Sequence, residues 1–215
     1  MNLLYQDAHM VVCVKPAGLL AQADSKGGES AVSKLEAAFG SIYPVHRLDK
    51  DTGGVMVFAR TQKAAAALSK AVQENKLNKE YLALLPGMPA AEAGELEDIL
   101  FHDRVKNRTY VVDRQRKGAK PAKLAYRVLE QRESAVLVQV RLFTGRTHQI
   151  RVQFASRKLP LLGDRKYGSR ESVPMALWAW RLTLPHPVTG KTLVFAALPD
   201  GSAAPWNRAS AWPTE

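Results

Sequence analysis

The sequence predicts an α+β fold: a mixed, mostly antiparallel central sheet with a few flanking helices. Segments with strand character outnumber helical ones, several are joined by hairpin-sized turns, and the helices are scattered along the chain. We expect a single domain over residues 1–215, made of two subdomains that share one sheet. The tail after about residue 200 is rich in Ala, Ser and Pro, which predicts loose packing and fraying.

The first third of the chain predicts two strands and two helices. The apolar run 10–14 indicates a buried strand, which the Pro and Gly of residues 15–18 end in a turn. Residues 29–39 place apolar side chains on one face, as a short helix requires. A second apolar run, 55–59, predicts another strand. An Ala-rich helix follows it, with Thr61 as the candidate N-cap and an end near residue 76.

The rest of the chain predicts mainly strands. They are expected at residues 80–85, 124–129, 135–143, 176–184 and 191–197. Residues 131–134 would form the turn of a hairpin, and a helix is expected over residues 147–156. The segment 102–123 differs in character, because it is strongly basic and contains Gly118 and Pro121. We expect it to be an exposed loop or ribbon.

The charge balance points to a polyanionic partner. The chain has 31 Lys and Arg residues against 20 Asp and Glu, which gives a net charge of +11. Each phosphate that such a surface neutralises releases counterions and adds affinity. The alternative is a basic protein that binds no nucleic acid. Hydrophobic residues make up 46% of the chain, which is too high for a disordered protein.

The sequence shows no sign of secretion or membrane insertion. No apolar run approaches the roughly 20 residues that span a bilayer, and the first residues lack the basic and apolar regions of a signal peptide. The single Cys13 excludes an internal disulfide and a cysteine-rich zinc site, and it fits a reducing compartment. We therefore expect a cytoplasmic monomer with no membrane contact and no obligate protein partner.

The run from His46 to Gly54 concentrates reactive side chains directly before an apolar strand. Asp49 lies near Arg47 and before two glycines that admit unusual backbone angles. It could therefore be held in a cleft as an ionised nucleophile or base. These residues alone leave two other interpretations open. One is a solvated turn with local salt bridges, and the other is a nuclease-like metal site of His46, Asp49 and Asp51.

A second group of polar residues lies between residues 144 and 151. Arg146, His148 and Arg151 fall at an expected helix start, a place suited to phosphate or carboxylate contact. An ordinary basic amphipathic helix is the alternative. Tyr81, near the start of an expected strand, could stack on a base or could belong to the core.

The segment 102–123 could hold phosphates, because its cations outnumber its two acids. The cations are Arg104, Lys106, Arg108, Arg114, Arg116, Lys117, Lys120 and Lys123. We expect this segment to contact the backbone of a nucleic acid.

Six separated segments resemble, in order, the motifs of the RluA-type pseudouridine synthases. They are residues 11–19, the run around Asp49, Lys79-Glu80-Tyr81, residues 145–151, Gly163-Asp164-Arg165-Lys166-Tyr167-Gly168 and His186-Pro187-Val188-Thr189-Gly190. The resemblance extends over roughly residues 3–198. Many members of that family carry an additional N-terminal RNA-binding domain of the S4 type. The first motif here begins almost at Met1, so we expect the compact form without that domain.

The resemblance implies an isomerase that converts a uridine of a ribosomal or transfer RNA stem-loop into pseudouridine, without a cofactor or a metal. Its fold would be the synthase catalytic domain with a central RNA-binding cleft. Asp49 would be the catalytic aspartate, Tyr81 would pack against the target base, and Arg151 would pair with Asp49 and orient it.

Further RNA contacts are expected beside these positions. Arg47 resembles the residue that the family inserts into the RNA stack where the uridine leaves. We also expect RNA contacts from His46, Arg146 and His148, which lie next to the implied catalytic residues in the chain.

The chain departs from the family pattern at four positions. Val14 stands where Asn is usual, Gly53 replaces a common Ser, Gln153 replaces a frequent His, and Trp178 replaces the His of a His-Ala pair. None of them is an implied catalytic position, so they bear on the shape of the pocket and hence on the substrate. A metal-dependent nuclease and a non-catalytic RNA-binding module remain as alternatives, but neither explains the other matched segments.

Overall fold

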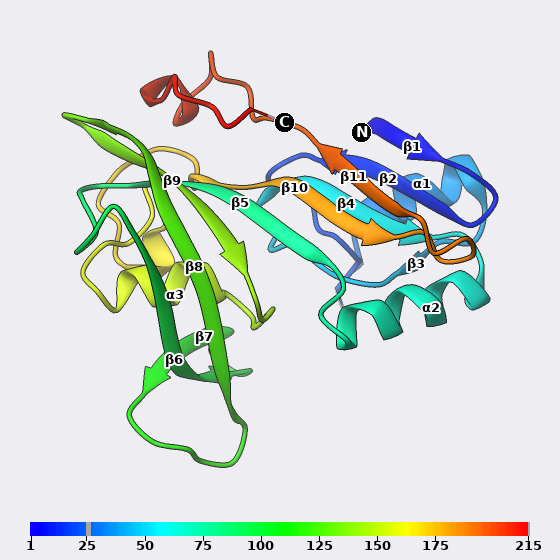
Figure 1. Ribbon diagram of the computed structural model, residues 1–215, viewed down its shortest axis with the longest axis horizontal. Helices are drawn as coiled ribbons and strands as arrows, with labels where there is room; N and C mark the ends of the chain where they lie inside the picture. The colour runs from blue at the N-terminus through cyan, green and yellow to red at the C-terminus, as the bar shows by residue number, and fades with distance from the viewer. Residues whose placement is uncertain (25–26, 215) are drawn as a thin grey trace. The chain divides into compact units, whose positions relative to one another are not determined.

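The computed structural model describes residues 1–24 and 27–214, which fall into two compact units (Figure 1). The first unit combines Met1–Lys79 with Trp178–Pro199, and the second combines Glu80–Leu177 with the chain from Asp200 onward. Most strands pair antiparallel, and the described residues contain three α-helices. The α+β class with mostly antiparallel strands is therefore confirmed.

The first unit is built from six strands and two α-helices. They are β1 (Asn2–Gln6), β2 (Met10–Lys15), α1 (Ala31–Phe39), β3 (Tyr43–Pro44), β4 (Gly53–Ala59), α2 (Gln62–Gln73), β10 (Leu177–Pro185) and β11 (Thr192–Ala196). The strand order is β1-β2-β4-β10, with β3 beside β4 and β11 beside β10. β4 and β10 run parallel, whereas the other pairs are antiparallel.

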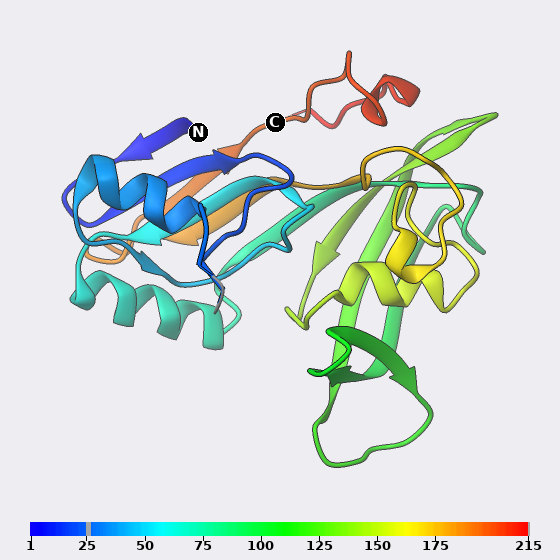
Figure 2. The same ribbon diagram turned by 180° about the vertical axis from the view of Figure 1, so that it is seen from behind.

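The core of the first unit forms where the apolar strands meet α2. Every residue of β4 is buried, and Val55 and Val57 pack with Ala64 and Leu68 of the helix. Figure 2 shows α1 in front of the strands, on the face that is hidden in Figure 1. Thr61 caps α2 as predicted, because its hydroxyl accepts a 3.1 Å hydrogen bond from the backbone N–H of Ala64.

The second unit contains five strands, one α-helix and two short 3-10 helices. They are β5 (Asn78–Leu85), β6 (Ala93–Asp103), β7 (Arg108–Val112), β8 (Ala119–Arg132), β9 (Ala135–Leu142), α3 (Gln149–Ala155), η1 (Arg165–Tyr167) and η2 (Trp206–Arg208). The strand order is β5-β9-β8-β6-β7. A small cluster of Leu100, Ala122, Val152 and Tyr167 joins the sheet to α3 and η1.

The basic segment 102–123, predicted as an exposed loop or ribbon, consists of paired strands joined by turns. It contains the end of β6, all of β7 and the start of β8, so it forms two sides of a hairpin and the strand beside it. The sequence missed β1, β3 and the whole of β6. Backbone hydrogen bonds between strands do not depend on apolar side chains, so a polar strand leaves a weak sequence pattern.

The tail makes specific contacts with the rest of the second unit. Trp206 is only 7% exposed. The carboxylate of Glu130, on β8, accepts hydrogen bonds from the backbone N–H groups of Ser210 (2.7 Å) and Ala211 (3.1 Å). Burial of the Glu130 carboxyl raises its pKa, but these hydrogen bonds outweigh that effect and lower the pKa to about 2. These contacts join the tail to Glu130, which lies some 80 residues earlier in the chain, so composition could not reveal them.

Membrane insertion by a helix finds no support. Within residues 1–24 and 27–214, no helix combines the length and the apolar character that crossing a bilayer requires.

Candidate active site

Asp49 lies in a tight turn directly before β4. The backbone N–H of Thr52 donates to the carbonyl oxygen of Asp49 at 3.1 Å and closes the turn, and the Asp49 side chain is half-buried. Gly54, where the chain enters the strand, has φ +121°, and a Cβ atom there would lie 2.1 Å from the carbonyl oxygen of Ala179. Only glycine fits that position. The close approach to Ala179 fixes the backbone at the start of β4 and, with it, the position of the preceding turn.

Lys15 supports this turn from inside the first unit. Its side chain is fully buried, and its ammonium donates to the carbonyl oxygens of Leu19 (2.7 Å), Pro16 (3.0 Å) and Lys50 (3.0 Å). The Lys50 carbonyl also accepts from the N–H of Gly18 at 2.9 Å. The residue after Asp49 is therefore held by two donors from the first motif of the chain.

The electrostatics of Lys15 reflect its position. Burial lowers the pKa of its ammonium to about 8, while the negative charges of Asp51 and Asp49 oppose that effect. The sequence analysis did not single out Lys15, although it lies in one of the matched segments.

His46 has a structural partner in the strand that follows the turn. The backbone N–H of Val57 donates to its Nε2 at 3.1 Å, so the neutral ring carries its proton on Nδ1. Burial, with a smaller effect from the charge of Lys79, lowers the pKa of His46 to about 3. A neutral ring adds no positive charge to an RNA surface, and neither nitrogen offers a lone pair to a metal. The predicted contact of His46 with RNA stays a prediction.

Without His46 as a ligand, the metal site of the nuclease alternative is incomplete. No group of three or more His, Cys, Asp or Glu side chains within the described part of the chain lies close enough to hold a metal ion. Because the Nε2 lone pair of His46 is committed to Val57, Asp49 and Asp51 would have to bind a metal without it.

Arg151 is held on α3 by an acid that the sequence analysis did not assign to the site. Its Nε and Nη2 donate to the Asp164 carboxylate at 2.7 and 2.8 Å, and both side chains are almost fully buried. Such a bidentate pair fixes the plane of the guanidinium. It uses two of the five N–H donors of the arginine. The predicted pairing of Arg151 with Asp49 stays a prediction.

Tyr167 connects this ion pair with the β6–β7 hairpin. Its ring lies 5.2 Å from the Arg151 guanidinium, and its hydroxyl accepts a 2.8 Å hydrogen bond from the backbone N–H of Thr109. The same hydroxyl lies 3.0 Å from Nδ1 of His148. The hairpin, the start of α3 and the arginine are thus joined through one buried side chain.

His148 and Arg146 are engaged within the second unit. His148 is 8% exposed and has a left-handed backbone, with φ 54°, at the N-cap of α3. Nε of Arg146 donates to the carbonyl oxygen of Pro121 at 2.9 Å. The buried position of His148 gives it no open face for a phosphate, whereas the half-buried Arg146 keeps part of its guanidinium in solvent.

Tyr81 lies on β5 and is 7% exposed, as a residue of a pocket wall or of the core would be. It belongs to the second unit with Arg151, whereas Asp49 and the exposed Arg47 belong to the first. The role of Tyr81 against a base is therefore still a prediction.

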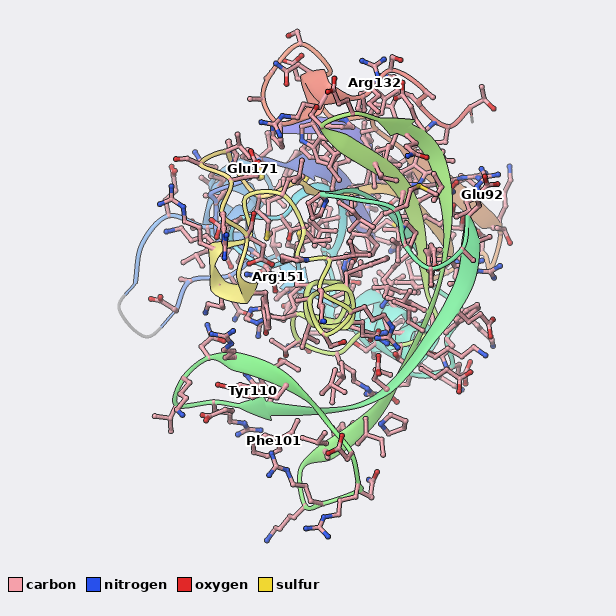
Figure 3. All side chains as sticks on the ribbon, turned by 90° about the vertical axis from the view of Figure 1, so that its left-hand side faces the viewer. Glu92, Phe101, Tyr110, Arg132, Arg151 and Glu171 are labelled. Carbon is pink, nitrogen blue, oxygen red and sulfur yellow. The ribbon has the colours of Figure 1, made fainter. Side chains whose placement is uncertain are left out.

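The predicted cations of segment 102–123 lie largely in solvent. Those that are exposed are Arg104, Lys106, Arg114, Arg116, Lys117 and Lys120, and Arg108 is half-buried. Two of them pack on aromatic rings, since the Arg116 guanidinium lies 4.0 Å from the ring of Phe101, and Arg108 lies over Tyr110. Figure 3 labels Phe101 and Tyr110 on the hairpin and Arg151 on α3.

Lys123 differs from the other cations of this segment. Its ammonium lies 2.7 Å from the carboxylates of both Glu95 and Glu97. Hydrogen bonds to these two groups raise the pKa of Lys123 to about 12. Its charge is neutralised locally, so we do not count it among the phosphate contacts.

Comparison with known proteins gives consistent matches. A family model described as RNA pseudouridylate synthase matches residues 9–156. The "Ribosomal large subunit pseudouridine synthase D" of Nitrosomonas europaea is 35% identical over 223 residues, which cover 95% of this chain and 64% of that protein. The "Dual-specificity RNA pseudouridine synthase RluA" of Escherichia coli K12 is 34% identical over 208 residues, which cover 92% of this chain and 93% of that protein.

The fold matches solved structures with similar descriptions. "Human RNA Pseudouridylate Synthase Domain Containing 4" superposes with a TM-score of 0.77 and 26% sequence identity. The match covers 93% of this chain and 89% of that chain.

Proposed function

The chain belongs to the RluA-type family of RNA pseudouridine synthases, and from this premise we propose that it converts a uridine in structured RNA into pseudouridine. The reaction breaks the bond between C1′ of the ribose and N1 of uracil and forms one between C1′ and C5. The C5 proton is lost to solvent and N1 gains one, so the reaction needs neither a redox partner nor an energy source.

Asp49 acts on the ribose in this proposal. It either attacks C1′ or removes a sugar proton to give a glycal, and the freed uracil turns and rejoins the sugar through C5. The observation that carries the proposal is the supported turn, in which Lys15 and Gly18 hold the residue next to Asp49. A carboxylate held in one place by buried groups loses less entropy on the way to the transition state than a mobile one.

Arg151 and Tyr81 complete the site as we propose it. Arg151 keeps Asp49 ionised and oriented, because an arginine beside a desolvated carboxylate offsets the cost of burying its charge. The fixed guanidinium plane in the pair with Asp164 supports this role. Tyr81 packs against the target base.

RNA binds through the exposed cations of the second unit. Their phosphate contacts would hold the RNA in register without reading its sequence. The target uridine must leave its stack to reach Asp49, and Arg47 would fill the space that it leaves. The name of the Escherichia coli relative describes dual specificity, and the name of the Nitrosomonas relative refers to the large ribosomal subunit. We propose a stem-loop of ribosomal or transfer RNA as the substrate.

Two further features are proposed from the sequence. The single cysteine, which lies buried in β2, suits a reducing cytoplasm. We also propose a monomer without an obligate protein partner, which size-exclusion chromatography with light scattering would test.

The decisive test replaces Asp49 by asparagine. RNA from a strain that lacks this protein, labelled with tritium at uridine C5, would release tritium on turnover. We expect Asp49→Asn to lower the rate by about 10³-fold or more while RNA binding persists, because an amide cannot replace the carboxylate. Asp51→Asn, the same change in the same turn, is the matched control and should keep most of the activity. Rapid release by Asp49→Asn would refute the proposal.

A further inference from the structure

β4, the strand after the turn that carries Asp49, begins with Gly53, although the backbone conformation at that position does not require a glycine. Gly53 is the first residue of β4 and lies opposite Trp178 of the parallel strand β10 (Figure 1). Its φ lies outside the left-handed region, unlike that of its neighbour Gly54. Any residue could adopt that backbone conformation, so the reason for glycine must lie in its surroundings.

The surroundings of Gly53 are occupied by the indole of Trp178. A Cβ atom on Gly53 would lie 2.3 Å from Cζ3 and 2.7 Å from Cε3 of the indole, far inside contact distance. The indole is fixed from its other edge, because its Nε1 donates to the carbonyl oxygen of Ala197 at 2.7 Å. It cannot move aside without losing that hydrogen bond.

The same position also touches the first motif of the chain. The backbone nitrogen of Ala17 would lie 3.2 Å from the added Cβ, and the next residue, Gly18, donates to the carbonyl oxygen of Lys50. The indole, the start of β4 and the loop around residue 17 therefore meet behind the turn that carries Asp49.

We propose that Trp178 is a positioning residue for Asp49 and that Gly53 is the partner that makes room for it. The inference rests on the proposed function of Asp49. The indole occupies the space that a side chain at position 53 would need. It packs against the backbone there, four residues after Asp49. Thr52, which closes the turn, stands between the two and is buried.

This coupling gives one explanation for two departures from the family pattern. Gly53 stands where serine is common, and Trp178 stands where histidine is usual. The larger indole at one position requires the loss of the side chain at the other. We therefore expect the protein to tolerate substitution of both positions together better than substitution of either position alone.

A cycle of four proteins tests the coupling: the natural chain, Gly53→Ser, Trp178→His and the double variant. Gly53→Ser alone should lower kcat in the tritium-release assay by about 10- to 100-fold, because it displaces the turn. KM should change little, since the phosphate contacts lie on the second unit. In the double variant, the serine should lower kcat by no more than about 2-fold relative to Trp178→His alone. Gly87→Ser is the control, because a Cβ there would meet only Leu159 at 3.8 Å.

The melting temperatures of the same proteins provide a readout that does not depend on turnover. Gly53→Ser should lower the melting temperature of the natural chain and should have little effect when position 178 is histidine. Equal effects of the serine in both backgrounds, on kcat or on melting, would overturn the coupling. A coupled melting temperature together with equal effects on kcat would overturn the positioning role alone. Failure of the proposed function would instead appear as unimpaired turnover by Asp49→Asn.

Discussion

Among the described residues, the partners of the Lys15 ammonium are three backbone carbonyl oxygens and no carboxylate. A charge in the interior is costly unless its donors are satisfied, and three acceptors satisfy all three protons of an ammonium. The side chain thus joins two loops, the one after β2 and the one that carries Asp49. A residue that ordinarily belongs on the surface is used here as an internal support.

His46 is a second titratable group whose burial has a measurable consequence. Its pKa of about 3 in the folded protein lies below the value of 6.5 of an unperturbed histidine. Between these two values the unfolded chain binds more protons than the folded one. Stability therefore falls as the pH decreases below 6.5, while above that pH the group has no further effect.

The prediction concerns the slope of stability against pH. Between about pH 6 and pH 5, His46 should contribute at most about 1.4 kcal/mol of lost stability per pH unit. His46→Gln keeps an acceptor for Val57 but does not titrate, so its free energy of unfolding, measured in urea, should decrease less with acid. An unchanged slope in His46→Gln would contradict the neutral, buried ring.

At the scale of elements, the β6–β7 hairpin combines rigidity with exposed charge. At its turn the Asp103 carboxylate accepts a 3.0 Å hydrogen bond from the N–H of Lys106, and Thr109, one residue pair away from the turn, donates its backbone N–H to the Tyr167 hydroxyl. Arg116 packs on Phe101, so part of the basic surface is pre-organised. Most of the exposed cations lie in the turns on either side of β7, and such contacts reduce the entropy that these side chains lose on binding phosphate.

Reversal of charge in the loop after β7 and at the start of β8 should weaken RNA binding and reduce its salt dependence. For Lys117→Glu with Lys120→Glu, we expect the slope of log K against log salt concentration to fall by about 2, one for each lost phosphate contact. The matched control is Lys70→Glu with Lys76→Glu, the same change of charge on and just after α2 of the first unit. Equal losses in both pairs would mean that net charge alone, and not this surface, binds the RNA.

The first turn of helix α3 positions Arg151. The left-handed backbone of His148 turns the chain into the helix, and Gln149 accepts from the N–H of Arg146 through its side chain. Arg151 then falls within the first turn, where Asp164 and Tyr167 can reach it. Loss of either charge would leave the other buried without its main partner, at about 3–5 kcal/mol.

At the scale of the whole molecule, the two ends of the chain belong to different units. The first unit begins at Met1 and receives β10 and β11 from late in the sequence, while the tail returns to the second unit. There Arg208 pairs with Glu171 at 3.1 Å, and Trp206 lies 6.2 Å from Trp212 between ring centres. The tail therefore completes the second unit.

This arrangement predicts that the tail stabilises the second unit. Trp206→Ala should lower the free energy of unfolding by about 3 kcal/mol, as expected for removal of a buried aromatic side chain. Ser202→Ala, an exposed change in the same tail, should stay within about 0.5 kcal/mol. Urea unfolding measures both. A Trp206→Ala protein as stable as the natural chain would show that the tail contributes nothing.

Much of the fold followed from local patterns. The continuous apolar runs of β2 and β4 and the Thr61 cap of α2 require only neighbouring residues to be recognised, and all three are present. The strand β6 was missed because its buried residues alternate irregularly with acids and its partner β8 is distant in the chain. The expected site residues were named from motifs, whereas Asp164 and Lys15 were not, since the contacts that matter for them, to Arg151 and to Lys50, join residues that are distant in the chain.

The sequence by itself determined the class of fold and the family, because each depends on short segments whose order and spacing are visible in the chain, and from the same segments it predicts that Asp49 is catalytic. Only the tertiary structure decided how the polar groups are partnered: Arg151 with Asp164, His46 with Val57, and Lys15 with Lys50. Burial makes such pairing obligatory, but the choice of partner depends on which distant segments meet. The same holds for Gly53, whose lack of a side chain has a reason only once Trp178 lies against it.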